Sequence, residues 1–496
     1  MAVPAYDWIG FHADLRPDSI ALIDDYTGKT HTYSELDNRV NRMAAWLAGH
    51  GVGDGDRVAF LSENTIDIFE VLFACAHLKA ILVPLNWRLA VPELQFIVGD
   101  SRPHVLIFEE QFQAEVDQLE APAFLRLGDD YEAALASADP TAAPPVTATH
   151  DDPLAIMYTS GTTGHPKGAL VTHRMFFYNA INIGDAVGLT HRSRNLNVLP
   201  TFHTGGLNLY TTPCLRLGAS SVNLREFDPA RLLHWLGSGE ITHFFGVPAV
   251  YQFLAEYDGW ESADLSRVES WACGGSPMPV ALLERYAERG IHIRQGMGLT
   301  ETSPTLFLTD EDHALTKAGS VGKPVLHTSI RIVDEDGADL PVGSIGELWA
   351  KGPNVTPGYW ERSEANADSF TDGWLHTGDA ARVDEDGYVY IVDRWKDMYI
   401  SGGENVYPAE VEQLLFRHEN VLDVAVIGIP DERWGESGLA VVVPRDPENF
   451  DAAEIIQFCD DKLARYKIPK QAVAVDELPR NAGGKVLKRQ LRQELL

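Results

Sequence analysis

The chain is poor in the features that mark disulfide-stapled, zinc-binding or membrane-spanning proteins. Its 496 residues include only four cysteines, Cys75, Cys214, Cys273 and Cys459, and no CxxC motif. Neither a disulfide framework nor a zinc site is expected, and scattered cysteines fit a reducing cytoplasm. The most apolar stretch, residues 66–85, is interrupted by charged side chains, so it predicts no transmembrane segment. The N-terminus shows no basic segment followed by an apolar run, and we expect no secretory signal.

Positive charge is also scarce. The chain has 72 acidic and 40 basic residues, a formal net charge of −32. Such a surface repels nucleic acid and anionic membranes, which disfavours a general nucleic-acid-binding role. A local basic cleft that holds an anion is still compatible with this balance. Contact with a membrane surface and a homodimeric assembly stay open.

The length and the pattern of apolar residues predict a multidomain α/β protein. Chains longer than about 250 to 300 residues usually divide into several domains. Residues 32–35, Thr-Tyr-Ser-Glu, form a capping-box pattern, and apolar residues then recur at helical spacing as far as Gly51. Residues 58–61 and 105–108 have the composition of short buried strands. This alternation of helices and strands is typical of a largely parallel sheet.

The pattern changes in the second half of the chain. After Ser329, short alternating segments and the turn sequence at residues 334–337 predict antiparallel strands. Charged residues and paired glycines at 393–403 mark a domain boundary. We therefore predict a large N-terminal domain, residues 1–395, with two α/β sheets and a small β region. A smaller α+β C-terminal domain, residues 396–496, is expected to follow.

A loop with phosphate-binding chemistry follows the apolar run at residues 154–158, which predicts a buried strand. The loop combines hydroxyls, glycines and a lysine: Thr159, Ser160, Gly161, Thr162, Thr163, Gly164, Lys167 and Gly168. Glycines at 161, 164 and 168 allow positive φ and close approach to a ligand, and the hydroxyls donate hydrogen bonds. Together these groups predict a polyphosphate nest. The P-loop pattern fails, because Pro166 and Gly168 occupy its second-glycine and Ser/Thr positions.

The order of strand, Thr/Ser/Gly loop and Pro-Lys-Gly resembles the signature of adenylate-forming enzymes, the acyl-CoA synthetase and ligase superfamily. From this loop alone, the competing interpretation is a flexible Ser/Gly-rich turn. The resemblance nevertheless extends over essentially the whole chain, with further motifs in the expected order. These motifs imply ATP and Mg²⁺ as cofactors and CoA as a co-substrate.

Residues 296–302, Gly-Met-Gly-Leu-Thr-Glu-Thr, resemble the family's Gly-aromatic-Gly-x-Thr-Glu segment. The resemblance implies that Thr300 contacts a phosphate and that Glu301 supports the magnesium ion. Magnesium prefers oxygen ligands and keeps several waters, so one carboxylate plus the phosphates suffices. Met297 stands where the family commonly has an aromatic residue, so this chain departs from the family at the usual adenine contact. The resemblance places adenine beside Gly274, Ser276, Met297 and Gly298.

Two further segments resemble the family's ribose and lysine motifs. At residues 376–379, His-Thr-Gly-Asp, the resemblance implies that Asp379 accepts hydrogen bonds from the ribose hydroxyls, with Arg394 assisting. Lys485 follows two glycines and matches the family's catalytic lysine. Its implied role is to bridge the attacking carboxylate and the α-phosphate as charge develops in the transition state.

The resemblance also implies a mobile C-terminal domain. Lys396 falls at the family's hinge position, and Gly402 and Gly403 resemble the loop that approaches the pantetheine tunnel. Adenylation requires Lys485 in the cleft, whereas thiol attack requires another face of the C-terminal domain there. Rotation about a hinge can exchange the two. His203 resembles the residue that lines the acyl site and gates the thiol. Thr204 stands where amino-acid-activating relatives place an aspartate, so an amino acid substrate is not expected.

These inferences predict a cytoplasmic AMP-forming carboxylic acid:CoA ligase. It would activate a fatty or otherwise apolar acid as an acyl-adenylate and then transfer the acyl group to CoA. Alternatives that stay open are an aryl-acid CoA ligase and a stand-alone enzyme that loads a carrier protein. A kinase-like enzyme releasing ADP and a non-catalytic nucleotide-binding protein are the remaining rivals.

Overall fold

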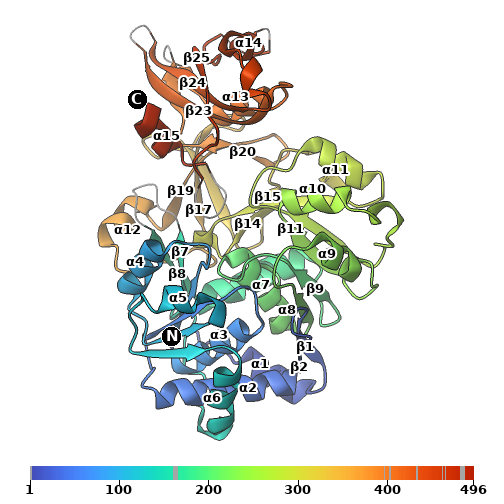
Figure 1. Cartoon of the computed structure of the whole chain (residues 1–496), viewed down its shortest axis with the longest axis vertical. Helices are drawn as coiled ribbons and strands as arrows, with labels where there is room; N and C mark the ends of the chain where they lie inside the picture. Colours follow the sequence, from blue (N-terminus) through green and yellow to red (C-terminus); the bar gives the residue numbers. More distant parts are fainter. Residues whose placement is uncertain are drawn as a thin grey trace. The chain divides into compact units, whose positions relative to one another are not determined.

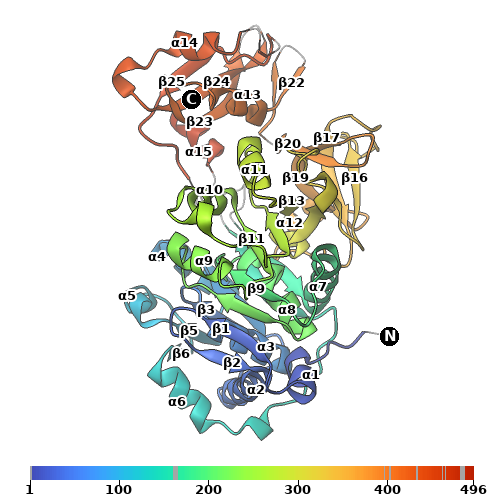
Figure 2. The same ribbon diagram turned by 90° about the vertical axis from the view of Figure 1, so that its right-hand side faces the viewer.

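The structure is a computed structural model (Figures 1 and 2) that describes residues 3–159, 166–395, 397–401, 404–431, 434–460, 462–463, 465–480 and 486–495. The chain forms two compact units. The first comprises Met1–Ser329 and Ala350–Leu375, and the second comprises Ile330–Trp349 and His376–Leu496. Within the described ranges, no helix is long and apolar enough to cross a membrane.

The first unit contains a six-stranded sheet in the order β6-β5-β3-β4-β7-β8. Its strands are β3 (Arg57–Leu61), β4 (Ile81–Leu85), β5 (Val105–Phe108), β6 (Ala123–Arg126), β7 (Pro153–Thr159) and β8 (Lys167–Thr172). All neighbouring strands are parallel except β8, which runs antiparallel to β7. The predicted strands at 58–61, 105–108 and 154–158 are thus confirmed.

Alternate residues of this sheet pack against different helices. The helices are α2 (Tyr33–Gly49), α3 (Asp67–Leu78), α4 (Val91–Ser101), α5 (Gln113–Val116) and α6 (Asp129–Ser137). On β3, Val58 and Phe60 belong to the core formed with α2, α3 and α6. Ala59 and Leu61 belong to the core formed with α4 and α5. Both faces are therefore buried, which explains why these strands are apolar throughout.

A nine-stranded sheet completes the first unit, in the order β15-β14-β13-β12-β11-β9-β10-β1-β2. Its strands are β1 (Ile20–Asp24), β2 (Thr30–Thr32), β9 (Arg194–Asn197), β10 (Ser220–Asn223), β11 (His243–Gly246), β12 (Ser270–Cys273), β13 (Ile293–Gly298), β14 (Thr305–Leu308) and β15 (Lys323–Pro324). Six consecutive strands run parallel to one another: β1, β10, β9, β11, β12 and β13. At the two ends, β2 is antiparallel to β1 and β14 is antiparallel to β13. The pairing of β1 with β10 joins the N-terminal segment to a sheet formed mainly by later residues.

Helices cover both faces of the nine-stranded sheet. They are α1 (Trp8–Leu15), α7 (His173–Val187), α8 (Thr211–Leu217), α9 (Pro229–Leu236), α10 (Pro248–Glu256) and α11 (Val280–Ala287). Buried side chains of α9, α10 and α11 form one core with the strands, and these helices lie together in Figures 1 and 2. Ile183 and Val187 of α7 and Cys214 of α8 belong to a separate cluster with Ala272 and Leu308.

The capping box predicted at residues 32–35 begins α2. The Thr32 hydroxyl accepts a hydrogen bond from the Glu35 amide at 3.2 Å, and the Glu35 carboxylate accepts one from the Thr32 amide at 2.8 Å. The apolar residues predicted for its inner face are all fully buried: Leu36, Val40, Met43, Ala44 and Leu47. Local sequence pattern therefore determines both the start and the orientation of this helix.

Antiparallel strands follow, as the sequence predicts. They form a five-stranded sheet with the order β16-β17-β19-β18, in which β20 pairs with β19. The bounds are β16 (Ser329–Val333), β17 (Gly346–Lys351), β18 (Phe370–Thr371), β19 (Trp374–Val383) and β20 (Val389–Arg394), with α12 (Ser363–Ser369) between β17 and β18. The predicted turn at 334–337 is present, because the Gly337 amide donates to the Asp334 carbonyl at 3.1 Å.

The C-terminal part of the second unit is the expected small α+β fold. Its strands are β21 (Tyr399–Ser401), β22 (Glu404–Val406), β23 (Val421–Asp431), β24 (Gly435–Pro444) and β25 (Gln471–Ala474), and its helices are α13 (Pro408–Leu415), α14 (Ala452–Gln457) and α15 (Lys488–Leu495). Along β23, Val424 and Val426 pack with α13 and α14, whereas Ala425 and Ile427 pack with α15.

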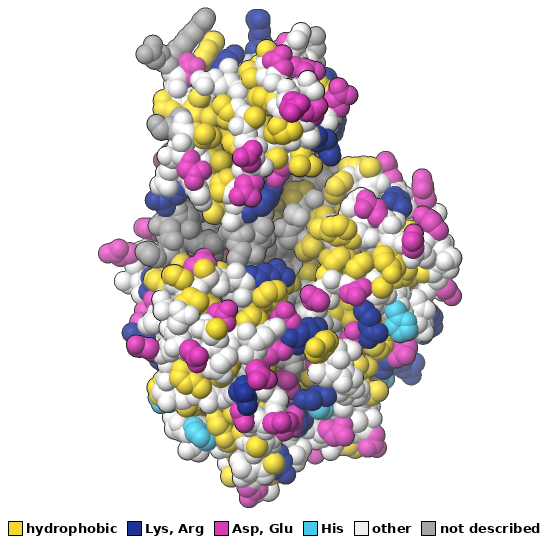
Figure 3. Space-filling view, viewed as in Figure 1, with side chains coloured by type: hydrophobic (Ala, Val, Ile, Leu, Met, Phe, Trp, Pro, Cys, Tyr) yellow, Lys and Arg dark blue, Asp and Glu magenta, His cyan; other side chains and the backbone are white. Residues whose placement is uncertain are grey.

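Figure 3 shows acidic and basic side chains interspersed over the visible face of the protein.

A buried ion-pair cluster joins three helices of the first unit. Glu70 of α3 is fully buried and accepts hydrogen bonds from Arg39 Nε at 2.6 Å and from the Tyr131 hydroxyl at 2.9 Å. Arg39 of α2 also donates to both carboxylate oxygens of Glu132 on α6, at 2.9 and 3.0 Å. One guanidinium thus connects a buried carboxylate with one whose side chain is 41% exposed.

The two carboxylates should contribute differently to stability. We expect Glu70→Gln to lower the free energy of unfolding by about 2 to 3 kcal/mol, since it removes charge-assisted hydrogen bonds in a buried site. The matched variant Glu132→Gln should cost less than about 1 kcal/mol, because water screens this pair. Urea denaturation at pH 7 measures both. Equal losses of unfolding free energy in the two variants would contradict the larger contribution expected from the buried Glu70 carboxylate.

Candidate functional site

The four residues predicted to border the adenine lie at one edge of the nine-stranded sheet. The carboxyl ends of β9, β11, β12 and β13 share this edge because these strands are parallel. Gly274 and Ser276 follow β12 directly, whereas Met297 and Gly298 end β13. A Cβ at Gly274 would lie 3.0 Å from the Gly296 carbonyl oxygen, so the two segments are in contact. Ligands of open α/β sheets bind at this edge.

The phosphate loop lies between β7 and β8. Thr159 and Lys167 are opposite each other in the antiparallel ladder, and the Thr159 hydroxyl donates to the Lys167 carbonyl at 3.4 Å. The ladder therefore holds the two ends of the loop together. The central loop residues predicted to bind phosphate, Ser160, Gly161, Thr162, Thr163 and Gly164, lie outside the described residues.

The sequence predicted a positive φ at Gly168, and this prediction was wrong. Gly168 lies in β8, and its φ is not positive. A Cβ at this position would lie 2.5 Å from the Ile156 side chain and 3.1 Å from the Tyr158 ring. Close packing against β7 therefore requires glycine here, since a larger residue would overlap these side chains.

Thr300 and Glu301 lie in a tight turn between β13 and β14. Residues Thr300–Thr302 form one 3₁₀ turn, and Ser303 has a φ of 61°. The Leu299 amide donates to the Pro304 carbonyl at 3.0 Å, which closes the hairpin. A Cβ at Gly298 would lie 1.8 Å from the Pro304 carbonyl oxygen. This glycine is thus required for the geometry of the turn that carries Glu301.

Buried asparagines that the motifs do not include hold this turn in place. Asn208 Nδ2 donates to the Ser303 carbonyl at 2.9 Å and to its hydroxyl at 2.8 Å. Asn354 Nδ2 donates to the Thr302 and Thr305 carbonyls at 3.2 and 3.0 Å. Both asparagines are fully buried. The sequence offers no signal for them, because each is an isolated asparagine whose partners are distant in the chain.

Tyr359 is a second residue that the motifs missed. Its hydroxyl donates to Glu301 Oε1 at 2.8 Å, and the Lys167 ammonium lies 5.3 Å from the centre of its ring. The Thr356 amide also donates to the Glu301 carbonyl at 2.8 Å. The structure thus brings Glu301 and Lys167, predicted from separate motifs, to the same tyrosine.

His203 lies beyond the carboxyl end of β9, just before a π-helical turn at Gly205–Leu209. Its carbonyl accepts hydrogen bonds from the Leu207 and Gly206 amides at 2.9 and 3.1 Å. The residue is exposed to solvent, yet neighbouring protein atoms remove part of the water around its ring. This desolvation, with the positive charge of Arg88, lowers the pKa of the imidazole to about 4. His203 is therefore neutral at pH 7 and can donate or accept a hydrogen bond.

The predicted ribose residues lie opposite each other in the second unit. Asp379 of β19 pairs with Arg394 of β20 in an antiparallel ladder. This hairpin explains why two residues fifteen positions apart are adjacent. Asp379 is buried, and its amide donates to the Thr377 hydroxyl at 3.2 Å. The Arg394 side chain lies outside the described part of the structure.

The remaining predicted residues, Lys396, Gly402, Gly403 and Lys485, lie outside the described residues. Two described neighbours of Lys485, Arg480 and Val486, form an antiparallel bridge, and the Leu487 amide donates to the Pro479 carbonyl at 2.8 Å. Helix α15, which starts at Lys488, is anchored by an ion pair between Lys488 and Glu412 at 2.8 Å. The residues on the two sides of the lysine segment are therefore paired with each other, and α15 is joined to α13.

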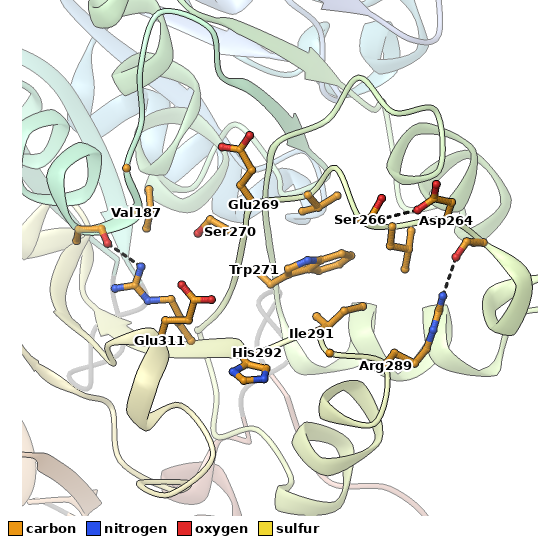
Figure 4. Close-up of a pocket in the computed structure, with 17 residues that line it drawn as sticks. Val187, Asp264, Ser266, Glu269, Ser270, Trp271, Arg289, Ile291, His292 and Glu311 are labelled. Carbon is orange, nitrogen blue, oxygen red and sulfur yellow. Dashed lines mark hydrogen bonds between the residues drawn. The ribbon is translucent and has the colours of Figure 1, made fainter.

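A cavity of about 570 Å³ lies at the opposite edge of the nine-stranded sheet (Figure 4). It is lined by residues at the amino ends of β12 and β13, including Ser270, Trp271 and His292. Its Arg289 donates to the Trp260 and Ala263 carbonyls at 2.6 and 2.7 Å, so this guanidinium is used in the fold. Because ligands of such sheets bind at the carboxyl edge, this cavity is not the candidate site.

The fold and the site together define an adenylate-forming enzyme. The AMP-binding enzyme family matches residues 11–360, and the AMP-binding enzyme C-terminal domain matches residues 410–485. The chain belongs to the AMP-binding enzyme family. It is an AMP-forming acid–thiol ligase that uses ATP with Mg²⁺ and takes CoA as co-substrate.

Curated relatives match over nearly the whole chain. A feruloyl-CoA synthase from Amycolatopsis is 42% identical over 486 residues, 98% of both chains. An indoleacetate–CoA ligase from Aromatoleum aromaticum is 40% identical over 503 residues, covering 98% of this chain and 97% of the relative. The solved o-succinylbenzoate CoA synthetase from Bacillus subtilis, in complex with its acyl-adenylate intermediate, has a TM-score of 0.90 at 33% identity and covers 98% of both chains.

We expect Gly298→Ala to disrupt the turn that carries Glu301. Its methyl group would overlap the Pro304 carbonyl, so the backbone must move, and misplacement by about 1 Å can lower the rate of adenylation about 10²-fold. Pyrophosphate release measures this step. The matched variant Gly99→Ala, on α4 with open space around the new methyl group, should keep wild-type activity. A fully active Gly298→Ala enzyme would contradict the assigned geometry.

Proposed function

We propose that this ligase activates an apolar carboxylic acid, and within that class an aryl acid. The observation that carries the site assignment is the convergence of Lys167 and Glu301 on Tyr359, since phosphate binding and metal binding must occur side by side. Thr204, beside His203, supports the exclusion of amino acids. The feruloyl-CoA synthase and the indoleacetate–CoA ligase are named for aryl acids and are more similar to this chain than a long-chain-fatty-acid–CoA ligase that is 36% identical, which favours an aryl acid.

In the first half-reaction, we propose that a carboxylate oxygen of the acid attacks the α-phosphorus of ATP and pyrophosphate leaves. Thr159, the loop residues 160–164 and Lys167 hold the β- and γ-phosphates. Thr300 contacts a phosphate, and Glu301 presents a carboxylate, the oxygen ligand that Mg²⁺ prefers; a bound ion would offset phosphate charge. Lys485 bridges the attacking oxygen and the α-phosphate, where negative charge accumulates in the transition state.

The other roles follow the same proposal. Gly274, Ser276, Met297 and Gly298 border the adenine, and Asp379 accepts hydrogen bonds from the ribose with Arg394 assisting. In the second half-reaction, the CoA thiolate attacks the acyl carbon and AMP leaves. Neutral His203 lines the acyl site, and Gly402 and Gly403 approach the pantetheine.

We also propose that residues 1–395 and 396–496 act as two domains with a hinge at Lys396, which lets one site carry out both half-reactions. The four buried, unpaired cysteines support a reducing cytoplasmic location. A homodimer stays a prediction. A carrier protein in place of CoA is the alternative acceptor, and comparing both thiols with one acid separates the two functions.

A panel of acids tests the substrate class. We expect pyrophosphate release with ferulate, indoleacetate and 3-phenylpropanoate, and acyl-CoA formation when CoA is added. Phenylalanine, which differs from 3-phenylpropanoate by its α-ammonium group, should react at least about 100-fold more slowly because a buried unpaired charge costs several kcal/mol. Equal turnover of this matched pair would contradict the exclusion of amino acids. Release of ADP would contradict the AMP-forming reaction.

Lys485→Ala should lower acid-dependent pyrophosphate release by about 10²- to 10³-fold, the usual effect of removing one transition-state donor. The thermal midpoint should not change. The control Lys470→Ala removes an exposed lysine of the same unit and should keep the wild-type rate. If both variants turn over normally, Lys485 has no part in the mechanism.

A further inference from the structure

Tyr359 lies in the segment between β17 and α12, and its backbone is joined to the phosphate hairpin. Tyr359 forms an antiparallel bridge with Ala169 of β8. The flanking hydrogen bonds run from the Trp360 amide to the Gly168 carbonyl at 2.7 Å and from the Leu170 amide to the Gly358 carbonyl at 3.0 Å. The position of Tyr359 is therefore coupled to the strand that begins with Lys167.

A second set of contacts fixes the same backbone from α12. Asn366 Oδ1 accepts a hydrogen bond from the Tyr359 amide at 2.7 Å, and Asn366 Nδ2 donates to the Tyr359 carbonyl at 3.1 Å. Gly358 has a φ of 146°, and a Cβ there would lie 2.7 Å from Asn366 Oδ1. Because only backbone groups of Tyr359 are used here, its side chain is left for another contact.

The side chain makes that contact with Glu301. The phenol donates to Glu301 Oε1 at 2.8 Å, and Thr356, three residues earlier, donates its amide to the Glu301 carbonyl. One short segment thus holds Glu301 by backbone and by side chain. The face of the same ring lies near the Lys167 ammonium.

We propose that Tyr359 is a positioning residue for the metal-supporting carboxylate of Glu301. Its hydroxyl fixes the carboxylate orientation through Oε1, and the other carboxylate oxygen would then be left to hold Mg²⁺. Its ring holds the Lys167 ammonium beside the metal site without neutralising the carboxylate in a direct ion pair. This inference rests on the proposed function, because it takes Glu301 as the residue that supports the ion.

The variant Tyr359→Phe removes the hydroxyl and keeps the ring. We expect the Mg²⁺ concentration for half-maximal pyrophosphate release to rise about tenfold, as for loss of a hydrogen bond to a charged group. The rate at saturating Mg²⁺ should stay within about twofold of wild type. The control Tyr26→Phe makes the same change at an exposed tyrosine of the same unit and should leave both values unchanged.

A binding measurement gives a readout that needs no turnover. Electron paramagnetic resonance of Mn²⁺ with enzyme and ATP, without the acid, should show about tenfold weaker Mn²⁺ binding in Tyr359→Phe. In an enzyme that already carries Glu301→Gln, adding Tyr359→Phe should cause no further loss, because the two residues act as one unit. This double variant separates positioning from general damage to the fold.

Two results of the single variant would overturn the proposal, and one of the double variant. One is wild-type metal dependence in Tyr359→Phe, and the other is a lower rate at every metal concentration with unchanged Mn²⁺ affinity. Full additivity with Glu301→Gln would also contradict it. Failure of the proposed function is distinguishable, because the wild-type protein would then release no pyrophosphate while the Mn²⁺ comparison still reports on Tyr359.

Discussion

The structure of the candidate site depends on backbone pairing that reverses the chain at the ends of two parallel strands. After β7 the chain returns as β8, and after β13 it returns as β14, in both cases antiparallel. Each reversal lies at the carboxyl end of a parallel strand, where open α/β sheets bind ligands. The paired strands lie so close at two positions that a side chain there would overlap the neighbouring strand. Gly168 and Gly298 are required there by packing.

Buried polar groups then hold these reversals in one conformation. A buried amide that lacks a partner costs about 1 to 3 kcal/mol, so Asn208 and Asn354 are stable only where the turn supplies the carbonyls that they bind. The same energetics restrain the turn itself. The segment that contains Asn354 and Tyr359 reaches both the Glu301 turn and β8, which makes it the physical connection between two motifs far apart in sequence.

Local patterns predicted the elements and the order of the motifs, whereas distant pairing was not predictable from them. The capping box at Thr32 and the apolar spacing of α2 depend on neighbouring residues, and both were confirmed. The β19–β20 register that sets Asp379 opposite Arg394 also follows from a short hairpin. By contrast, β1 joins β10 across nearly two hundred residues. Asn208 and Tyr359 have partners that only the fold brings near, and nothing in their local sequence marks them.

The distribution of charge explains how an acidic protein can bind a polyanion. Its net charge of −32 lowers the concentration of ATP near the surface, so the site must supply its own positive groups. The Lys167 ammonium lies over the ring of Tyr359. The ring attracts a cation but, unlike a carboxylate, carries no negative charge that would offset it. His203 contributes no positive charge, because desolvation and the charge of Arg88 lower the pKa of its imidazole and keep it neutral. Lys167 is such a group, and it lies where the segment that contains Tyr359 connects the two hairpins.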